Sequence, residues 1–459
     1  MQELRDYQKT CIEFSLKNSS AGLFLDAGLG KSRIILETFH ILQEADVVDT
    51  LFIIAGRKIC KLVWPLELEK WGFEMPVTFL NAPTKQRETN IHDYEPVGMC
   101  LITYDLIPWF KEYYGKYAKH LNLGRIMMVI DESSKFKSTG SARFRKLKSI
   151  LNVFDRRYIL SATPMPNHLL DLYAQIYILD GGERLGTKTS FKNNFFVPAG
   201  YMGYESKPIE NAEPLIFERI KDIAMRFDSD KLNLPALNVV DINLYLGKKV
   251  MKAHKELKDE LITVLDKNLI DAAHAGVVVN KLRQLTGGAV YQEDVGKNRK
   301  WDVYHDDKIG LLKELVEELQ GKPLLVAYNF NHEKERLKEA FKDYSPTFFE
   351  SGASDTRAAK IEQDWNAGKI DLMFGHPASI GHGLNLQGVG AAICFYSLDY
   401  NYDTYYQFIK RIYRQGQQHK VFVYRLVARD TIDEQIILNL KKKHKGQTSF
   451  LNLLKRASH

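Results

Sequence analysis

The sequence has few cysteines, and none of them is arranged as a metal or disulfide site requires. Its 459 residues include four, Cys11, Cys60, Cys100 and Cys394, and no two form a CxxC pair. This spacing argues against a zinc ribbon and against a disulfide framework. The thirteen histidines form no metal-ligand cluster with cysteines or acids either. We therefore expect reduced thiols, as in a cytosolic protein.

Long apolar runs and a strong net charge are also missing. No run approaches the ~18 residues of a membrane span, and residues 1–10 are charged and polar, so we expect no export signal and no membrane anchor. The net charge of +7 comes from 64 basic and 57 acidic residues. This small excess means that any nucleic-acid site must be a local patch. The length allows two or three domains, with no repeat or proline-rich linker between them.

One stretch, Leu23–Ser32, has the pattern of a phosphate-binding loop. A short apolar run predicts a buried strand, Gly28 and Gly30 end it, and Lys31 and Ser32 open a helical pattern. Glycines let the backbone approach an anion, Lys31 adds a positive charge, and the Ser32 hydroxyl can hold magnesium. The strict loop pattern has a further glycine, which leucine replaces here, and a Gly-Lys-Ser alone also occurs in ordinary turns. The expected ligand is a nucleoside triphosphate.

A second apolar strand pattern, Ile126–Ile130, ends in the paired acids Asp131 and Glu132. Asp131 can hold magnesium through water, and Glu132 can polarise an attacking water. Paired acids after a strand also occur at ordinary helix N-termini. The alternation of strand and helix patterns over 23–179 predicts one doubly wound α/β domain.

Polar residues at the start of the chain and at the ends of strand patterns are further candidates. The Gln8 amide offers a donor and an acceptor that suit an adenine edge, although a plain surface glutamine has the same chemistry. Arg57, Lys58 and Thr103 follow apolar runs, and ligands bind at strand ends in open α/β sheets. They could contact backbone phosphates or be solvated loop residues.

The remaining chain predicts a second α/β lobe. We expect a first lobe at 1–180, a helical and irregular connecting region at 181–307, and a second lobe at 308–459 that ends in a long helix. The second lobe has no Gly-Lys-Ser, so it should not bind phosphates through a loop of its own. Arg411 and Arg414 are expected on one helix face, spaced to reach a γ-phosphate together, or as part of a basic solvated helix.

The order of these pieces resembles superfamily II helicase-like ATPases, and within them the Swi/Snf-type family of double-stranded DNA translocases. Separated motifs covering nearly the whole chain carry the resemblance: Leu4-Arg5-x-Tyr7-Gln8, Asp26-x-Gly28-x-Gly30-Lys31-Ser32, Trp64…Glu67…Lys70-Trp71, Asn167, Leu282-Arg283-Gln284, Gly383-x-Asn385-Leu386 and Gln407…Arg411…Arg414-x-Gly416-Gln417.

The resemblance implies a fold class, cofactors and residue roles. The fold is α/β, with two tandem RecA-like lobes built on parallel sheets and a helical connecting region, and the cofactors are ATP and Mg²⁺. ATP would contact Arg5, Gln8, Asp26, Gly28, Gly30, Lys31, Ser32 and Gly383, and Mg²⁺ would contact Ser32 and Asp131. The catalytic group would be Glu132, Lys31, Arg411, Arg414 and Gln407. DNA contact or coupling would involve Arg57, Lys58, Thr103, Ser161, Thr163, Ser379 and Asn385.

Three departures from the family pattern concern coupling and substrate more than hydrolysis: Ser134 replaces the usual histidine or related polar residue, Ile380-Gly381 replaces two glycines, and Tyr400 replaces a tryptophan. The compact core resembles bacterial and phage-encoded members, so we expect it in the cytoplasm of a bacterium or of a phage-infected host. The expected partner is double-stranded DNA, with branched or gapped forms open, and the chain is expected to act as a monomer or in transient association. A strand-separating helicase, and a scaffold that uses ATP only as a switch, are the alternatives.

Overall fold

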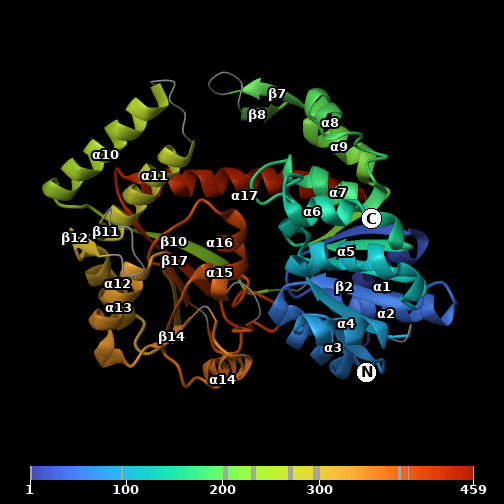
Figure 1. Ribbon diagram of the computed structural model, residues 1–459. Coiled ribbons are helices and arrows are strands. Elements are labelled where there is room, and N and C mark those ends of the chain that lie inside the picture. Colours follow the sequence, from blue (N-terminus) through green and yellow to red (C-terminus); the bar gives the residue numbers. More distant parts are fainter. Residues whose placement is uncertain are drawn as a thin grey trace. The chain divides into compact units, whose positions relative to one another are not determined.

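The computed structural model describes residues 3–94, 97–199, 205–228, 234–266, 272–292, 300–350, 352–380, 384–390 and 392–457. The chain divides into two compact units. Unit 1 is Met1–Asn233 with Lys443–His459, and unit 2 is Leu234–Lys442. Each unit has its own parallel sheet (Figure 1).

Unit 1 is built on a seven-stranded sheet of order β3-β4-β2-β5-β6-β1-β9, in which all neighbouring strands are parallel. Its strands are β1 (Ser20–Leu25), β2 (Thr50–Ala55), β3 (Val77–Phe79), β4 (Met99–Thr103), β5 (Ile126–Asp131), β6 (Arg156–Leu160) and β9 (Ala224–Phe227). Its helices are α1 (Asp6–Lys17), α2 (Lys31–Glu44), α3 (Trp64–Trp71), α4 (Thr84–His92), α5 (Ile107–Tyr117), α6 (Ala142–Lys148), α7 (Asp171–Asp180), α8 (Lys188–Phe195) and α9 (Ala212–Ile220). A hairpin, β7 (Phe196–Ala199) and β8 (Glu205–Pro208), follows α8.

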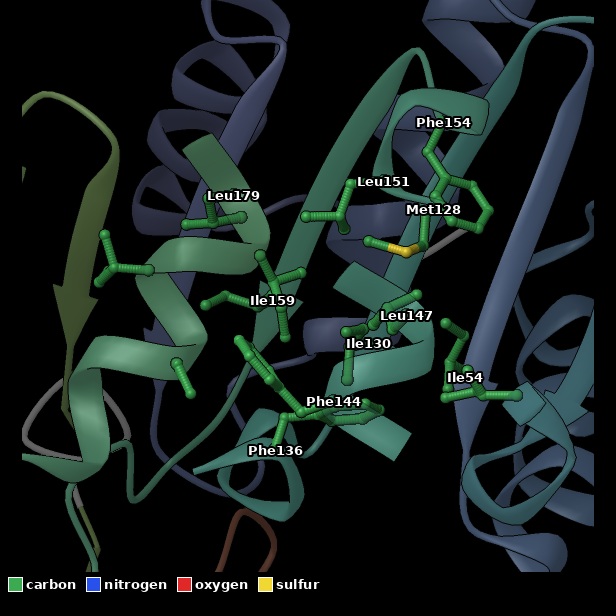
Figure 2. Packing of buried hydrophobic residues seen from close by; sticks show 14 of the residues in the cluster. Ile54, Met128, Ile130, Phe136, Phe144, Leu147, Leu151, Phe154, Ile159 and Leu179 are labelled. Carbon is green, nitrogen blue, oxygen red and sulfur yellow. The ribbon is translucent and has the colours of Figure 1, made fainter. Parts of the chain in front are cut away.

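The unit 1 sheet is covered on both faces because alternate side chains of each strand enter different cores. Leu23 of β1 packs with residues of α1, α2 and α3, whereas Phe24 packs with residues of α5, α6 and α7. Figure 2 shows part of the second core, where Ile130 and Ile159 of the sheet meet Phe144 of α6. Because both faces of the sheet pack against apolar side chains, polar functional groups are expected at the ends of the strands.

Unit 2 is built on a six-stranded parallel sheet of order β10-β17-β16-β13-β15-β14. Its strands are β10 (Leu237–Leu244), β13 (Leu324–Ala327), β14 (Thr347–Phe349), β15 (Leu372–Gly375), β16 (Ala392–Phe395) and β17 (Val421–Ala428), and a small hairpin is formed by β11 (Ala289–Tyr291) and β12 (Trp301–Val303). Its helices are α10 (Lys248–Asp266), α11 (Ala272–Thr286), α12 (Asp307–Glu318), α13 (Asn331–Ala340), α14 (Asp355–Asn366), α15 (Pro377–Ile380) and α16 (Tyr402–Ile409). The last helix, α17 (Ile432–Ala457), begins in unit 2 and ends in unit 1.

The two parallel sheets confirm the expected fold class of two tandem α/β lobes with parallel sheets. Within the expected connecting region, α10 and α11 confirm that part of it is helical. The region also contains strands that the pattern did not predict, and two of them join the main sheets: β9 pairs with β1 in unit 1, and β10 pairs with β17 in unit 2. Over the described residues, no helix has the length and apolar character needed to cross a bilayer.

Candidate nucleotide site and arginine cluster

The predicted strand, loop and helix over Leu23–Ser32 are confirmed. β1 ends at Leu25, and Lys31 begins α2 with Ser32 in its first turn. The loop turns through the positive φ angles of Gly28 (88°) and Gly30 (75°), a region that L side chains rarely adopt. Lys31 Nζ donates to the carbonyl oxygens of Leu25 (2.8 Å) and Asp26 (3.3 Å). The lysine is therefore held at the end of the strand, inside the loop.

The charge of Lys31 is balanced by acids from separate strands. Burial lowers the pKa of Lys31, and the negative charges of Glu132, Asp131 and Asp26 oppose that shift. Burial raises the pKa of Asp131, and Lys31 and a hydrogen bond from Trp64 oppose this. Unit 1 thus brings the predicted phosphate lysine and the predicted acidic pair into one electrostatic group.

Gln8 lies against the loop. Its Nε2 donates to the Leu29 carbonyl oxygen (3.4 Å), and its Oε1 accepts from the Arg5 backbone amide (3.0 Å). A Cβ on Gly30 would lie 2.5 Å from Gln8 Nε2, so only glycine allows this approach. The structure therefore brings Gln8 to the loop and bonds it to the backbone of Arg5, while the contact of both residues with adenine remains a prediction.

Asp131 ends β5 and is fixed by neighbours from other elements. Trp64 Nε1 donates to Asp131 Oδ2 at 3.2 Å, and the Tyr104 hydroxyl donates to the Asp131 carbonyl oxygen. The indole bond favours the ionised carboxylate, which is the form that binds a cation.

Glu132 has a strained backbone and a firmly held carboxylate. Its φ of 64° lies in the left-handed region, which costs a non-glycine residue free energy. Its Oε1 accepts from the hydroxyls of Ser134 (2.9 Å) and Ser161 (2.7 Å), and Ser161 Oγ accepts from the Thr163 amide (3.1 Å). The structure therefore joins the predicted water-polarising residue directly to Ser161 and, through Ser161, to Thr163, the two residues predicted to couple it to DNA.

Gln175 of α7 is a residue that the sequence analysis missed. It is fully buried, and its Oε1 accepts from the Ser133 hydroxyl at 2.7 Å. Its Nε2 donates to the carbonyl oxygens of Pro164 (2.5 Å) and Asp171 (2.9 Å). One amide thus ties the loop after β5 to the turn after β6. The available signal was a glutamine inside an otherwise apolar helical pattern.

Asp26 forms a buried ion pair with Arg226 of β9, a second residue that the sequence analysis missed. Arg226 Nη2 lies 2.7 Å from Asp26 Oδ1, and Arg226 Nη1 donates to the Phe24 carbonyl oxygen at 3.1 Å. The two residues are 4% and 8% exposed. The pair fixes the end of β1 against the edge strand β9, and the predicted contact of Asp26 with ATP stays a prediction.

The three phosphate-contact candidates lie at the same sheet edge as the loop, because β2 and β4 run parallel to β1 and β5. Arg57 and Lys58 follow β2, and Arg57 is exposed. Thr103 ends β4, is buried, and donates to Asn81 Oδ1 at 2.7 Å. Their contact with DNA remains a prediction.

The donors for a metal ion are few. Over the described residues, no group of three or more histidine, cysteine, aspartate or glutamate side chains is gathered as a metal site. Mg²⁺ bound together with a nucleotide typically takes only one or two protein oxygens, and the phosphates and waters supply the rest. Asp131 and Ser32, at the end of β5 and the start of α2, fit that requirement.

In unit 2 the predicted arginines form a local cluster with two other predicted residues. Arg411 donates from Nε to the Gln407 carbonyl oxygen (3.2 Å) and from Nη2 to Gln407 Oε1 (3.4 Å). Arg414 Nη1 donates to Asn385 Oδ1. Glu362 lies close to the same group. Burial raises the pKa of Glu362, and hydrogen bonds with Asn385 and the charges of Arg414 and Arg411 oppose that shift.

The expectation that Arg411 and Arg414 share a helix face is wrong. α16 ends at Ile409, and both arginines lie in the turns that follow it. The chain leaves the helix because it pairs with the segment after α15: Leu386 N donates to the Arg411 carbonyl oxygen at 2.9 Å, and Arg411 Nη1 donates to the Leu384 carbonyl oxygen at 3.2 Å. Ser379 lies in α15 of the same unit, and Gly383 lies outside the described residues.

Comparison with known proteins gives the chain a family. Residues 7–287 match the SNF2-related domain, and residues 307–416 match the helicase conserved C-terminal domain. Protein p41 of Acyrthosiphon pisum secondary endosymbiont phage 1 is 30% identical over 473 residues, covering 98% of this chain and 98% of the relative.

Two further similarities concern a longer relative and a solved structure. A DNA repair and recombination protein RAD54-like from Danio rerio is 23% identical over 497 residues, covering 95% of this chain; the chain spans 65% of that relative's length. A solved Sulfolobus solfataricus SWI2/SNF2 ATPase core in complex with dsDNA is similar with 18% identity and a TM-score of 0.43, covering 98% of this chain and 95% of that one. Because the SNF2-related domain matches more than half of the residues and the phage relative matches over almost its full length, the chain belongs to the Swi/Snf-type family of helicase-like ATPases.

Proposed function

We propose that the protein is an ATP-dependent motor that translocates on double-stranded DNA, in repair, recombination or replication. The observation that carries the proposal is the Glu132 carboxylate, which Ser134 and Ser161 hold within the charge group that includes Lys31. A general base must be oriented and kept ionised. A scaffold that binds ATP without hydrolysing it has no need for such an arrangement.

The residues of unit 1 fit ATP with Mg²⁺. The loop presents glycines at positive φ and a buried lysine, and Gln8 lies at its rim. We propose that Lys31 binds the β- and γ-phosphates and that Ser32 and Asp131 hold Mg²⁺. Bound Mg²⁺ would neutralise charge on the phosphate oxygens, while Glu132 orients and polarises the attacking water.

We propose that Arg411 and Arg414 supply positive charge to the γ-phosphate during the cycle, with Gln407 holding Arg411. Arginine suits this role because its guanidinium stays ionised and bonds phosphate oxygens in a fork. The contacts of Arg411 with Gln407 and of Arg414 with Asn385 support the proposal that the two arginines and the two polar residues act as one group.

We propose that hydrolysis is coupled to DNA through Ser161 and Thr163. The Ser161 hydroxyl donates a hydrogen bond to the Glu132 carboxylate and accepts one from the Thr163 amide. A change at the γ-phosphate can therefore be passed to the turn after β6. Arg57, Lys58 and Thr103 in unit 1, with Ser379 and Asn385 in unit 2, would contact the DNA backbone. Such contacts allow tracking with little sequence preference. Family membership and the repair function named for the zebrafish relative support DNA as the substrate, and the phage relative supports a bacterial or infected-cell cytoplasm as its place of action.

The test is ATP turnover with duplex DNA, single-stranded DNA and RNA, for the wild type and for Lys31→Ala as the control. We expect duplex DNA to stimulate the wild type most, and Lys31→Ala to abolish turnover on every polymer. Stimulation by RNA alone would overturn the proposal. Displacement of a labelled oligonucleotide from a duplex would identify a strand-separating helicase instead, whereas removal of a third strand from an intact duplex would identify a translocase.

A further inference from the structure

Unit 1 contains a pocket of about 390 Å³ that shares no residue with the nucleotide site. It is lined by α6, by α7, and by the glycine-containing turn that leads into α8. Among its lining residues are Arg145 and Lys148 of α6, Tyr177 of α7, Lys188 of α8 and Thr139. The lining has three cationic side chains and no carboxylate.

The turn between α7 and α8 gives the pocket a fixed wall. Gly182 has a φ of 97°, and a Cβ there would lie 2.8 Å from the Tyr177 ring. The Tyr173 hydroxyl donates to the Gly186 carbonyl oxygen at 3.0 Å, and the Gly182 amide donates to Asp180 Oδ1 at 2.8 Å. The hollow therefore depends on a glycine backbone packed against an aromatic ring.

The cations of α6 fall into two classes. Arg143 pairs with Asp105 at 2.9 Å and Lys146 pairs with Glu112 at 3.0 Å. Arg145 and Lys148, which line the pocket, make no ion pair with a carboxylate among the described residues. Two cations of α6 are thus paired with carboxylates, and the other two line the pocket without such a partner among the described residues.

The two lysines of the pocket are held by uncharged partners. Lys188 Nζ donates to Thr139 Oγ1 at 2.7 Å, and Lys148 Nζ lies 4.4 Å from the centre of the Tyr177 ring. Each of these contacts positions an ammonium without cancelling its charge. An anion entering the pocket would meet an arginine fork, two ammonium groups and a threonine hydroxyl.

We propose that this pocket binds a backbone phosphate of nucleic acid. Phosphate oxygens accept hydrogen bonds from arginine and lysine together, and the volume exceeds that of one phosphate group, which leaves room for an attached sugar. Arg145, Lys148 and Lys188 are exposed, so each contact is weak alone, and a polymer that supplies neighbouring phosphates gains from all of them. The assignment rests on the proposed function only in taking DNA as the polymer.

The test measures the salt dependence of binding to a labelled duplex DNA, by fluorescence anisotropy without nucleotide. The pocket variant is Arg145→Ala with Lys148→Ala, and the matched control is Arg143→Ala with Lys146→Ala, which removes the same charge from the same helix. Each lost phosphate contact lowers the slope of log K against log salt by about 0.9. We expect the pocket variant to lower the slope by about 1 to 2 and the affinity about tenfold or more, and the control to stay close to wild type.

The outcomes separate this inference from the proposed function. Wild-type binding to duplex DNA with equal slopes for both double variants would overturn the pocket assignment and leave the motor intact. Failure of the wild type to bind any duplex would count against the motor itself. A third arm titrates inorganic phosphate: saturation of the pocket at low millimolar phosphate with no loss of bound DNA would identify a small-anion site and overturn the assignment. Basal ATP turnover without DNA and the melting temperature should match wild type in both double variants. Lys188→Glu, which places a negative charge at the pocket, should also weaken DNA binding relative to wild type.

Discussion

The two units use buried charge differently. In unit 1 a buried ion pair belongs to the predicted nucleotide site: Asp26 pairs with Arg226 beside Lys31, whose charge interacts with the acids after β5. In unit 2 the most deeply buried ion pair of the described residues, Lys308 with Asp433 at 2.7 Å, involves none of the predicted site residues. The arginines predicted to act there are only partly buried and lie in turns.

In these two ion pairs, stability and the expected chemistry share residues in unit 1 and involve separate residues in unit 2. Removing a charge from the unit 1 site leaves its buried partners uncompensated, which destabilises the fold as well as the chemistry. Removing an arginine from the cluster in unit 2 removes a partly solvated group. The predictions below test that separation.

The largest expected effect is on Arg414. We expect Arg414→Ala to lower kcat for ATP hydrolysis by about 10³-fold or more, the usual contribution of an arginine that stabilises a transferring phosphoryl group. The melting temperature should stay close to wild type because the side chain is only partly buried. Phosphate release and thermal unfolding measure the two effects. Arg414→Lys is the control, and full activity of this variant would show that the fork geometry is not needed.

Glu132→Gln should lower kcat by about 10² to 10⁴-fold, because an amide cannot act as the base. The amide oxygen can still accept hydrogen bonds from the hydroxyls of Ser134 and Ser161, but the buried Lys31 loses a charge partner, so we also expect a lower free energy of unfolding. Steady-state turnover is compared with binding of a fluorescent ATP analogue. A variant that turns over ATP like wild type would support the switch-only scaffold.

Arg226→Met and Lys308→Met form a matched pair, one in each unit. Each removes one partner of a buried ion pair, which costs about 3 to 5 kcal/mol of stability. We expect Arg226→Met also to weaken ATP binding, because Asp26 lies in the phosphate loop, and Lys308→Met to leave ATP affinity unchanged. Urea unfolding and nucleotide titration measure the two effects. Equal ATP affinities for both variants would contradict the claim that the buried ion pair of unit 1 also serves nucleotide binding.

Acid should destabilise unit 2 through His332. This side chain is fully buried, and neither ring nitrogen has a hydrogen-bond partner among the described residues. Burial and the nearby Arg336 charge lower the pKa of His332 to about 3, against about 6.5 when unfolded. Between these values the unfolded chain binds a proton that the folded chain does not, so stability falls as pH falls.

At pH 5 this loss amounts to about 2 kcal/mol relative to neutral pH. His332→Phe should remove it, because Phe330 and Tyr291 already surround the ring and can pack against phenylalanine. Urea unfolding at pH 7.5 and pH 5 measures the difference between the two proteins. An identical pH dependence in both would contradict the assignment.

The smallest expected effect is on Gln175. Gln175→Leu removes the bonds to Ser133 and Pro164, and we expect kcat to fall about tenfold with KM for ATP little changed, consistent with loss of a hydrogen bond worth about 1 kcal/mol. Ser133→Ala with Gln175→Leu should recover stability without recovering kcat. Recovery of both would show that Gln175 acts through stability alone.

Much of unit 1 could be predicted because its signals are local. The glycines, Lys31 and the acids after an apolar strand are read within a few residues of each other, and parallel strands bring their carboxyl ends to one edge. For the arginines of unit 2 the predicted secondary structure was wrong, and their predicted role stays a prediction. The helix that the pattern extended through them ends at Ile409, because the segment 384–386 pairs with the chain there.

Short spacings and residue types were enough to predict the type of most elements, the phosphate loop and the chemistry expected of its side chains. Only the folded chain shows which distant residues complete the site: Arg226 reaches Asp26 because β9 pairs with β1, and Gln175 reaches Ser133 because α7 packs beside the loop after β5. The cationic pocket arises in the same way, from three elements of unit 1 that converge. Such partners are fixed by strand order and helix packing, which no local pattern records.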